Sequence, residues 1–170
     1  MNNDSKIVSL PPIIDNQSKV LILGSIPSVE SLKKQEYYGN KRNHFWTILF
    51  TIFQKDPSED YTEKLSCLKQ HHIALWDVIH SCLRAGSLDS NIQKEQPNDL
   101  IDLLNQFPNI KFIGFNGGKS YEVFKKHIGL EAIHPVHFMK LPSTSPVPGK
   151  NVKSLEQKIE DWKIIQNYTT

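Results

Sequence analysis

Cysteine is scarce in this sequence, and long hydrophobic runs are absent from it. Its 170 residues include two cysteines, Cys67 and Cys82, which are too few for an iron–sulfur cluster. No C-x-x-C pair occurs, so the histidines near both cysteines do not favour a structural zinc site. No apolar run approaches the ~20 residues of a membrane span, and the polar first residues do not resemble a secretion signal. We expect a soluble, cytoplasmic protein without a metal ion.

A strong net charge is absent too. The formal charge is +2, which neither requires nor excludes a nucleic-acid partner, so the placement of individual side chains must decide. A hydrophobic content of 38% in 170 residues is enough for one buried core. We therefore expect a single domain over residues 1–170, in which residues 1–18 form a polar, extended N-terminal arm on the surface.

Short apolar runs alternate along the chain with stretches of helical periodicity. Strands are predicted at residues 20–23, 73–79, 110–115 and 134–139, and helices at 28–35, 45–53, 61–72, 99–107 and 120–127. A final amphipathic helix is predicted to carry on its apolar face Val152, Leu155, Ile159, Trp162 and Ile165. Residues 81–98 are predicted to form a long polar linker. The alternation predicts an α/β fold, a three-layer α/β/α sandwich with a short four-stranded parallel sheet.

Ligands of such sheets bind beyond the carboxyl ends of the strands. Here those ends are predicted at Gly24 and Ser25, at Asp77, at Asn116 and at residues 141–143. Paired carboxylates are missing from them, and no G-x-S-x-G turn supports a catalytic serine.

A phosphate-binding loop is the main alternative at the third of these ends. Residues 114–120 read GFNGGKS between a predicted strand and a predicted helix, and Asp77 then resembles a magnesium ligand. The pattern G-x-x-x-x-G-K-[ST] needs one more residue between its glycines, so the loop is one residue short. An NTPase of this type would also leave the aromatic residues after the first strand unexplained.

The loop at residues 37–44 combines an aromatic ring, an amide and two cations. Tyr38 offers a stacking face, Asn43 an amide, and Lys41 and Arg42 charges for phosphate, which together suit a nucleotide turned out of a DNA duplex. We expect Tyr38 to line a pocket rather than the core, because it adjoins Gly39 and a polar loop. Asn43 also stands where it can cap the helix that begins at residue 45.

The loop at residues 141–150, LPSTSPVPGK, has features that suit the same ligand. Its hydroxyl groups and backbone amides can contact phosphates, and its apolar tip can press into a base stack. Taken alone, the same composition is typical of an ordinary proline-rich turn.

Five stretches of the sequence, in order, resemble the uracil-DNA glycosylase superfamily, and most closely its hypoxanthine (deoxyinosine) DNA glycosylase branch. They are GSIPSVESL at residues 24–32, YYGNKRNHFW at 37–46, IALWDVIHSCLRAGSLDSNI at 73–92, FIGFNG at 112–117 and LPSTSP at 141–146. The resemblance implies a monomeric enzyme without a cofactor that removes a deaminated base from double-stranded DNA. It also implies that the fold is the four-stranded parallel sandwich of that superfamily.

The resemblance further implies roles for individual residues. Asn43 matches the catalytic asparagine, Tyr38 matches the ring on which the flipped base stacks, and the loop at 142–146 matches the segment that presses into the minor groove. The base pocket is implied at Gly24, Ser25 and Ile26. Two positions depart from the superfamily pattern, because relatives carry a polar side chain where Ile26 and Leu141 stand here.

From these residues we predict the chemistry of the site. Asn43 orients water through its carbonyl oxygen, and backbone donors at Ser25 and Ile26 hold the leaving base. Asp77 reads the base edge, orders water or pairs with Arg84. DNA contacts are predicted for Ser28, Lys41, Arg42, Ser143, Thr144, Ser145 and Lys150. No lysine has a clear nucleophile position, so we expect no strand-cleaving lyase activity. Excision of uracil or of a mismatched base, and a non-enzymatic DNA-binding module, remain alternatives.

Overall fold

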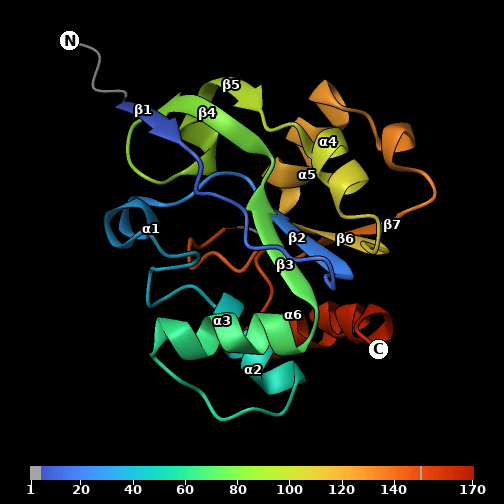
Figure 1. Ribbon diagram of the computed structural model, residues 1–170. Coiled ribbons are helices and arrows are strands. Elements are labelled where there is room, and N and C mark those ends of the chain that lie inside the picture. Colours follow the sequence, from blue (N-terminus) through green and yellow to red (C-terminus); the bar gives the residue numbers. More distant parts are fainter. Residues whose placement is uncertain (1–4, 150) are drawn as a thin grey trace.

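The computed structural model describes residues 5–149 and 151–170. At its centre is a four-stranded sheet in the order β3-β2-β6-β7, in which every neighbouring pair is parallel. Its strands are β2 (Val20–Gly24), β3 (Ile73–Asp77), β6 (Phe112–Asn116) and β7 (His137–Leu141). The predicted parallel sheet is therefore confirmed. Because the strands are parallel, their carboxyl ends meet at one edge of the sheet, as the ribbon shows (Figure 1).

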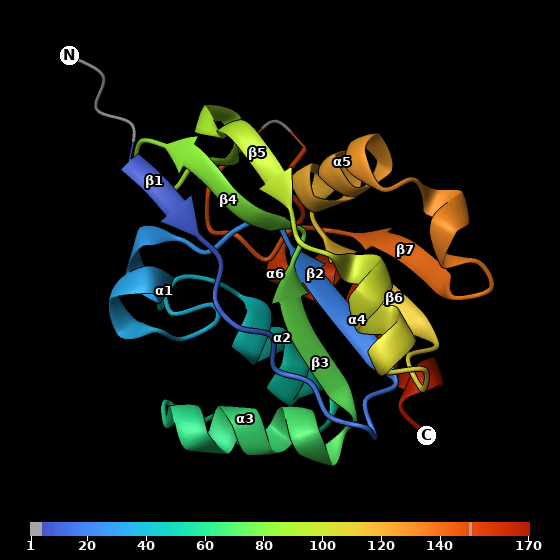
Figure 2. The ribbon, with the colours of Figure 1, turned by 45° about the horizontal axis from the view of Figure 1, so that its top comes forward.

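Helices cover both faces of this sheet, which makes the three predicted layers. The side chains of β2 alternate: Val20 and Ile22 pack with α2 (Phe45–Ile52), α3 (Tyr61–Gln70) and α6 (Leu155–Trp162). Leu21 and Leu23 pack on the other face with α4 (Leu100–Gln106) and α5 (Gly118–His127). The two views show these helix groups on opposite sides of the sheet (Figures 1 and 2). All five residues of β2 are buried because both faces are covered.

A second sheet was not predicted. Its strands β1 (Ser5–Val8), β4 (Ile79–Arg84) and β5 (Gln93–Pro97) pair antiparallel in the order β1-β4-β5. The prediction of a polar linker at 81–98 is therefore wrong, because a strand with one exposed face keeps polar residues on that face. β5 is QKEQP, with no apolar side chain except that of its proline. The described part of the predicted N-terminal arm, residues 5–18, supplies β1 and an isolated bridge from Ile13 to Leu75.

The final helix begins later than predicted. α6 starts at Leu155, where Ser154 and Gln157 form a capping box, and it continues into the 3-10 helix η3 (Lys163–Tyr168). Val152 precedes the cap and is 52% exposed, so its predicted place on the apolar face is wrong. The remaining elements are α1 (Val29–Lys34) and the 3-10 helices η1 (Asp89–Asn91) and η2 (Leu130–Ile133). In the described residues, no helix has the length and apolar character required to cross a membrane.

Candidate functional site

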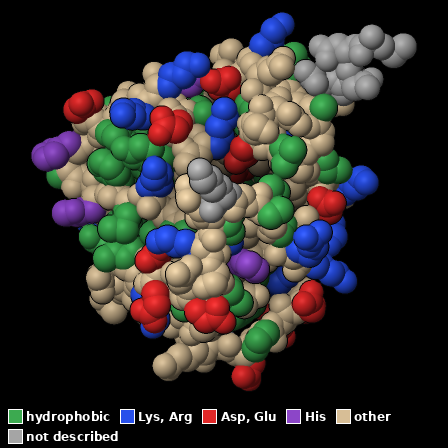
Figure 3. All heavy atoms as spheres, turned by 180° about the vertical axis from the view of Figure 1, so that it is seen from behind, with side chains coloured by type: hydrophobic (Ala, Val, Ile, Leu, Met, Phe, Trp, Pro, Cys, Tyr) green, Lys and Arg blue, Asp and Glu red, His purple; other side chains and the backbone are tan. Residues whose placement is uncertain are grey.

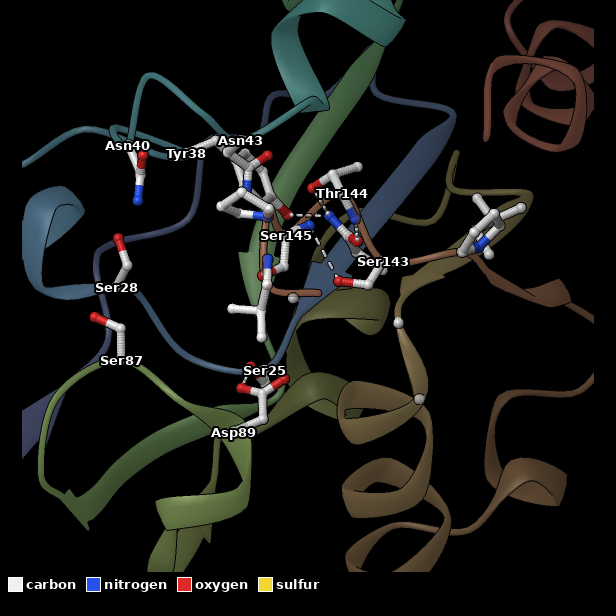
Figure 4. A pocket seen from close by; sticks show the side chains of 18 of the residues that line it. Ser25, Ser28, Tyr38, Asn40, Asn43, Ser87, Asp89, Ser143, Thr144 and Ser145 are labelled. Carbon is white, nitrogen blue, oxygen red and sulfur yellow. Dashed lines mark hydrogen bonds between the residues drawn. The ribbon is translucent and has the colours of Figure 1, made fainter. Parts of the chain in front are cut away.

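A pocket of about 990 Å³ opens at the carboxyl ends of the parallel strands. Every predicted strand end contributes to it, and so do residues 151–153 and two residues of α6, Lys158 and Asp161. The loop before α2 and the segment around η1 also line it, as the labelled side chains show (Figure 4). The predicted site residues that line it are Gly24, Ser25, Ile26, Ser28, Tyr38, Asn43, Asp77, Ser143, Thr144 and Ser145. Residues far apart in sequence are thus brought together at the carboxyl ends of the parallel strands, where ligands of such sheets bind.

Gly24 allows the end of β2 to approach two polar groups closely. A Cβ atom at this position would stand 2.6 Å from Asp77 Oδ1 and 3.3 Å from the Tyr38 hydroxyl oxygen. The next residue, Ser25, donates a hydrogen bond from Oγ to Asp89 Oδ1 at 2.7 Å, and Figure 4 shows the two side chains together. The apolar side chains that depart from the superfamily pattern, Ile26 and Leu141, are buried in the core.

Tyr38 presents one face of its ring to the pocket. Its other face stacks on Phe45, with ring centroids 4.1 Å apart, and its hydroxyl accepts a hydrogen bond from Asn116 Nδ2 at 3.2 Å. Burial, followed by the charge of Asp77, raises the pKa of Tyr38 far above its usual range, so the phenol stays neutral. The ring is therefore held rigidly in place, and the prediction that it lines a pocket is confirmed.

Asn43 precedes His44, the N-cap of α2, and lines the pocket. Its Oδ1 accepts a hydrogen bond from the backbone N–H of Phe45 at 2.9 Å, which fixes the side chain. A carbonyl oxygen has two lone pairs, so one remains to accept from a water molecule. Helix α2 is apolar around most of its surface and deeply packed, which gives this amide a rigid support.

Two of the three predicted cations lie outside the pocket. Lys41 and Arg42 are exposed on the loop that precedes Asn43, and neither is among the residues that line the pocket. On the face of the molecule opposite that of Figure 1, lysine and arginine side chains stand around a hollow together with acidic ones (Figure 3). Lys150, also predicted to bind DNA, lies outside the described residues.

Asn116 is a central residue that the sequence did not identify as part of the site. From the end of β6, its Nδ2 donates to Tyr38 and, at 3.0 Å, to Thr144 Oγ1, while its Oδ1 accepts from the Thr144 N–H at 3.0 Å. Thr144 is only 1% exposed, so its side chain does not stand free to contact phosphate as predicted. It instead joins the loop after β7 to the strand ends. The only sequence signal for Asn116 was its place at a predicted strand end.

Lys158 was missed altogether. This α6 residue is 2% exposed, lines the pocket, and donates from Nζ to His44 Nδ1 at 3.2 Å and to the carbonyl oxygen of Ser145 at 3.5 Å. Burial lowers its pKa from the usual range of lysine. The backbone N–H of His44 also donates to the backbone carbonyl oxygen of Thr144 at 2.9 Å. These hydrogen bonds connect the loop before α2 to the loop after β7.

Asp77 is buried at the pocket without a neutralising partner. It is 4% exposed, and its Oδ2 has no hydrogen-bond partner. The predicted ion pair with Arg84 is not formed. That guanidinium donates from Nη2 and Nε to the carbonyl oxygens of Pro27 and Gly86 at 2.7 and 2.6 Å, and its Nη1 has no hydrogen-bond partner. Burial, followed by the charge of Asp89, raises the pKa of Asp77 to about 7, although Arg84 opposes the shift.

The geometry does not favour a metal site or a phosphate-binding loop. In the part of the chain that is described, no group of three or more His, Cys, Asp or Glu side chains is placed to hold a metal ion. The GFNGGKS stretch forms the end of β6 and the start of α5, with Gly117 at a φ of 91° against Ser143. Its Lys119 is not among the residues that line the pocket.

Comparison with known proteins agrees with this geometry. The family model described as uracil DNA glycosylase superfamily matches residues 11–166. Two proteins named hypoxanthine DNA glycosylase, from Methanosarcina acetivorans and Methanosarcina barkeri, are each 37% identical, over 91% and 89% of this chain and 94% and 92% of their own. A solution NMR structure from Methanosarcina acetivorans, described as a candidate uracil DNA glycosylase, superposes with a TM-score of 0.77 at 33% identity, covering 97% of this chain and 99% of that one. The chain belongs to the uracil DNA glycosylase superfamily.

Proposed function

We propose that this protein is a DNA glycosylase that hydrolyses the bond between hypoxanthine and the deoxyribose of deoxyinosine in double-stranded DNA. The observation that carries the proposal is the convergence of Tyr38 and Asn43 on one pocket at the strand ends. The names of the two relatives from Methanosarcina support hypoxanthine as the base. Removal of uracil by the same site is the second candidate, because the family model bears that name.

The base stacks on the free face of Tyr38 after it leaves the duplex. As the C1′–N9 bond breaks, the electron pair stays with the base and positive charge develops on the sugar. Asn43, held by the Phe45 N–H, orients a water molecule toward C1′ and favours the cationic sugar through its carbonyl dipole. The water oxygen bonds to C1′ and its proton passes to solvent, while the base anion takes up a proton from solvent, which leaves an abasic site and neutral hypoxanthine.

Around this centre, the other residues bind the substrate. The backbone at Gly24, Ser25 and Ile26 and the side chain of Asp77 contact the base. Ser28, Lys41, Arg42, Ser143, Ser145 and Lys150 contact the DNA backbone, and the half-exposed Val147 is the apolar tip that presses into the base stack. All the proposed catalytic and base-binding groups belong to one chain, so we propose that the enzyme acts as a monomer. Its two cysteines are buried and free, which suits the cytoplasm.

We propose that the enzyme does not cleave the DNA strand itself. Lys158 is the one pocket lysine deep inside the described site, and its amine is engaged by His44 and Ser145. Strand breaks in treated DNA should therefore appear only after hot alkali. Breaks before alkali treatment would show that a lysine attacks the abasic sugar.

The test uses duplex oligonucleotides with a single deoxyinosine, deoxyuridine or deoxyxanthosine. The wild type should form abasic sites at deoxyinosine, and Asn43→Ala should lose roughly 100-fold or more of the excision rate while DNA affinity is retained. Lys119→Ala is the control, because it should excise like the wild type. ATP or GTP hydrolysis that depends on Lys119, or binding of damaged DNA without excision, would favour the other classes of protein.

A further inference from the structure

The carboxyl group of Asp77 is an unpartnered polar group at the bottom of the proposed base site. Its side chain is more than nine-tenths buried, its Oδ2 has no partner, and its Oδ1 is 2.6 Å from where a Gly24 Cβ would stand. A buried polar oxygen without a hydrogen bond destabilises the folded protein. Such a group is therefore suited to a ligand that supplies the missing hydrogen bonds.

Among the charged groups around Asp77, Asp89 opposes the ionised form and Arg84 favours it, while burial disfavours it most. The β4–η1 segment presents Asp89 and Arg84, and the loop before α2 presents Tyr37 and Tyr38. The adjacent strand β2 ends at Gly24 and is followed by Ser25, and β6, on the far side of β2, ends at Asn116, so these strand ends carry no titratable group. Arg84 donates from Nε and Nη2 to backbone carbonyls and its Nη1 has no partner, while the negative charge of Asp89 repels a second carboxylate. A pKa of about 7 for Asp77 is consistent with this arrangement.

The protonation state decides which bases the carboxyl group can read. A neutral carboxyl group presents one donor and one acceptor side by side, whereas a carboxylate presents acceptors only. The lactam edge of hypoxanthine presents the complementary pair, an acceptor at O6 and a donor at N1–H. A carboxylate would place one oxygen against O6 and repel it.

We propose that Asp77 binds the base as a neutral carboxylic acid. Its O–H donates a hydrogen bond to the lactam oxygen, and its other oxygen accepts a hydrogen bond from the adjacent ring N–H. This inference rests on the proposed function and adds to it the chemistry of base recognition. The negative charge that develops on the base as the C1′–N9 bond breaks spreads to O6, so the hydrogen bond from Asp77 is stronger in the transition state than in the ground state. No covalent step involves Asp77, and the water proton goes to solvent.

The test is the single-turnover rate of hypoxanthine excision between pH 5.5 and 9 for the wild type, Asp77→Asn and Asp77→Leu. The wild-type rate should fall about tenfold per pH unit above a midpoint of about 7 or higher, because only the neutral acid donates. Asp77→Asn keeps a donor and an acceptor but does not titrate, so it should stay within about tenfold of the wild type at pH 6 and lack this fall. Asp77→Leu should lose about 100-fold or more at every pH.

A further variant tests whether the charge of Asp89 helps to keep Asp77 protonated. Asp89→Asn removes the neighbouring negative charge, so the fall in rate should begin at a lower pH than in the wild type. A wild-type rate that does not change with pH, a fall that persists in Asp77→Asn, or full activity of Asp77→Leu would each overturn the inference. If the wild type releases no base at any pH, the proposed function itself fails. DNA affinity and thermal unfolding of each variant confirm that it is folded.

Discussion

At the scale of single residues, the site depends on how closely the end of β2 approaches Asp77 and Tyr38. Only a residue without a side chain leaves both oxygens in place, since a Cβ at Gly24 would lie within van der Waals distance of each. The shape of the pocket therefore depends on the absence of a side chain at Gly24 as well as on the polar groups that line it.

We predict that Gly24→Ala lowers the excision rate at least about 100-fold, because the added methyl group displaces Asp77 and intrudes on the base. The rate is measured under single turnover with deoxyinosine DNA. Gly118→Ala is a matched control, since a methyl group there meets nothing within 4 Å. Equal rates for the wild type and Gly24→Ala would show that the base does not enter beside this glycine.

Residues of the site differ in how far the sequence could predict them. Tyr38 and Asn43 belong to one local loop, so their residue types and spacing indicate a nucleotide pocket before any fold is known. Asn116 and Lys158 act through partners that are distant in sequence, at separations of 78 residues to Tyr38 and 114 residues to His44. Such partnerships leave no local pattern. The same holds for Asp77, whose unpaired state depends on where Arg84 points.

At the scale of elements, the pocket is held by ties between loops. Lys158 on α6 joins His44, at the start of α2, to Ser145 in the loop after β7, and Asn116 joins that loop to Tyr38. Two loops that carry the proposed catalytic and DNA-binding groups are thereby fixed relative to each other. This preorganisation avoids the cost of ordering the loops during the reaction.

We predict that Lys158→Met lowers the excision rate about tenfold or more without unfolding the protein, because an apolar side chain of similar length fills the buried site but donates no hydrogen bonds. Single-turnover kinetics measure the rate, and amide hydrogen exchange in residues 142–149 measures the loosened loop. The control is Lys163→Met, which removes an exposed lysine paired with Glu160. Unchanged kinetics and exchange would show that the loops do not depend on Lys158.

At the scale of the whole molecule, the N-terminal arm is an integral part of the fold. Ile7 and Leu10 are buried, and carbonyl oxygens of Leu10 and Pro11 accept hydrogen bonds from the Trp76 indole and the Tyr37 hydroxyl. The arm therefore supports the strand that carries Asp77 and the loop that carries Tyr38.

We predict that deletion of residues 1–12 lowers the free energy of unfolding by about 3 to 6 kcal/mol, from the loss of two buried aliphatic side chains alone. Urea denaturation followed by tryptophan fluorescence measures the change. Val8→Ala is the control, because it shortens a 46% exposed side chain of the same arm and should leave the unfolding midpoint in place. A shortened chain as stable as the full one would show that the arm only lies on the surface.

The main sheet could be predicted from the sequence and the second sheet could not, for a physical reason. Strands covered on both faces are continuous apolar runs, such as VLIL at residues 20–23, and these are conspicuous in a sequence. β4 and β5 each leave a face to solvent, and β1 pairs across more than 70 residues with β4. Polar strands of this kind resemble linkers until their partners are known.

The release of free base from duplex DNA with a single deoxyinosine tests the central claim most directly. Mass spectrometry of the products should show hypoxanthine and an abasic strand with the wild type, and roughly 100-fold less or none with Asn43→Ala at the same DNA occupancy. Absence of hypoxanthine from the wild-type reaction, or equal release by Asn43→Ala, would contradict the account.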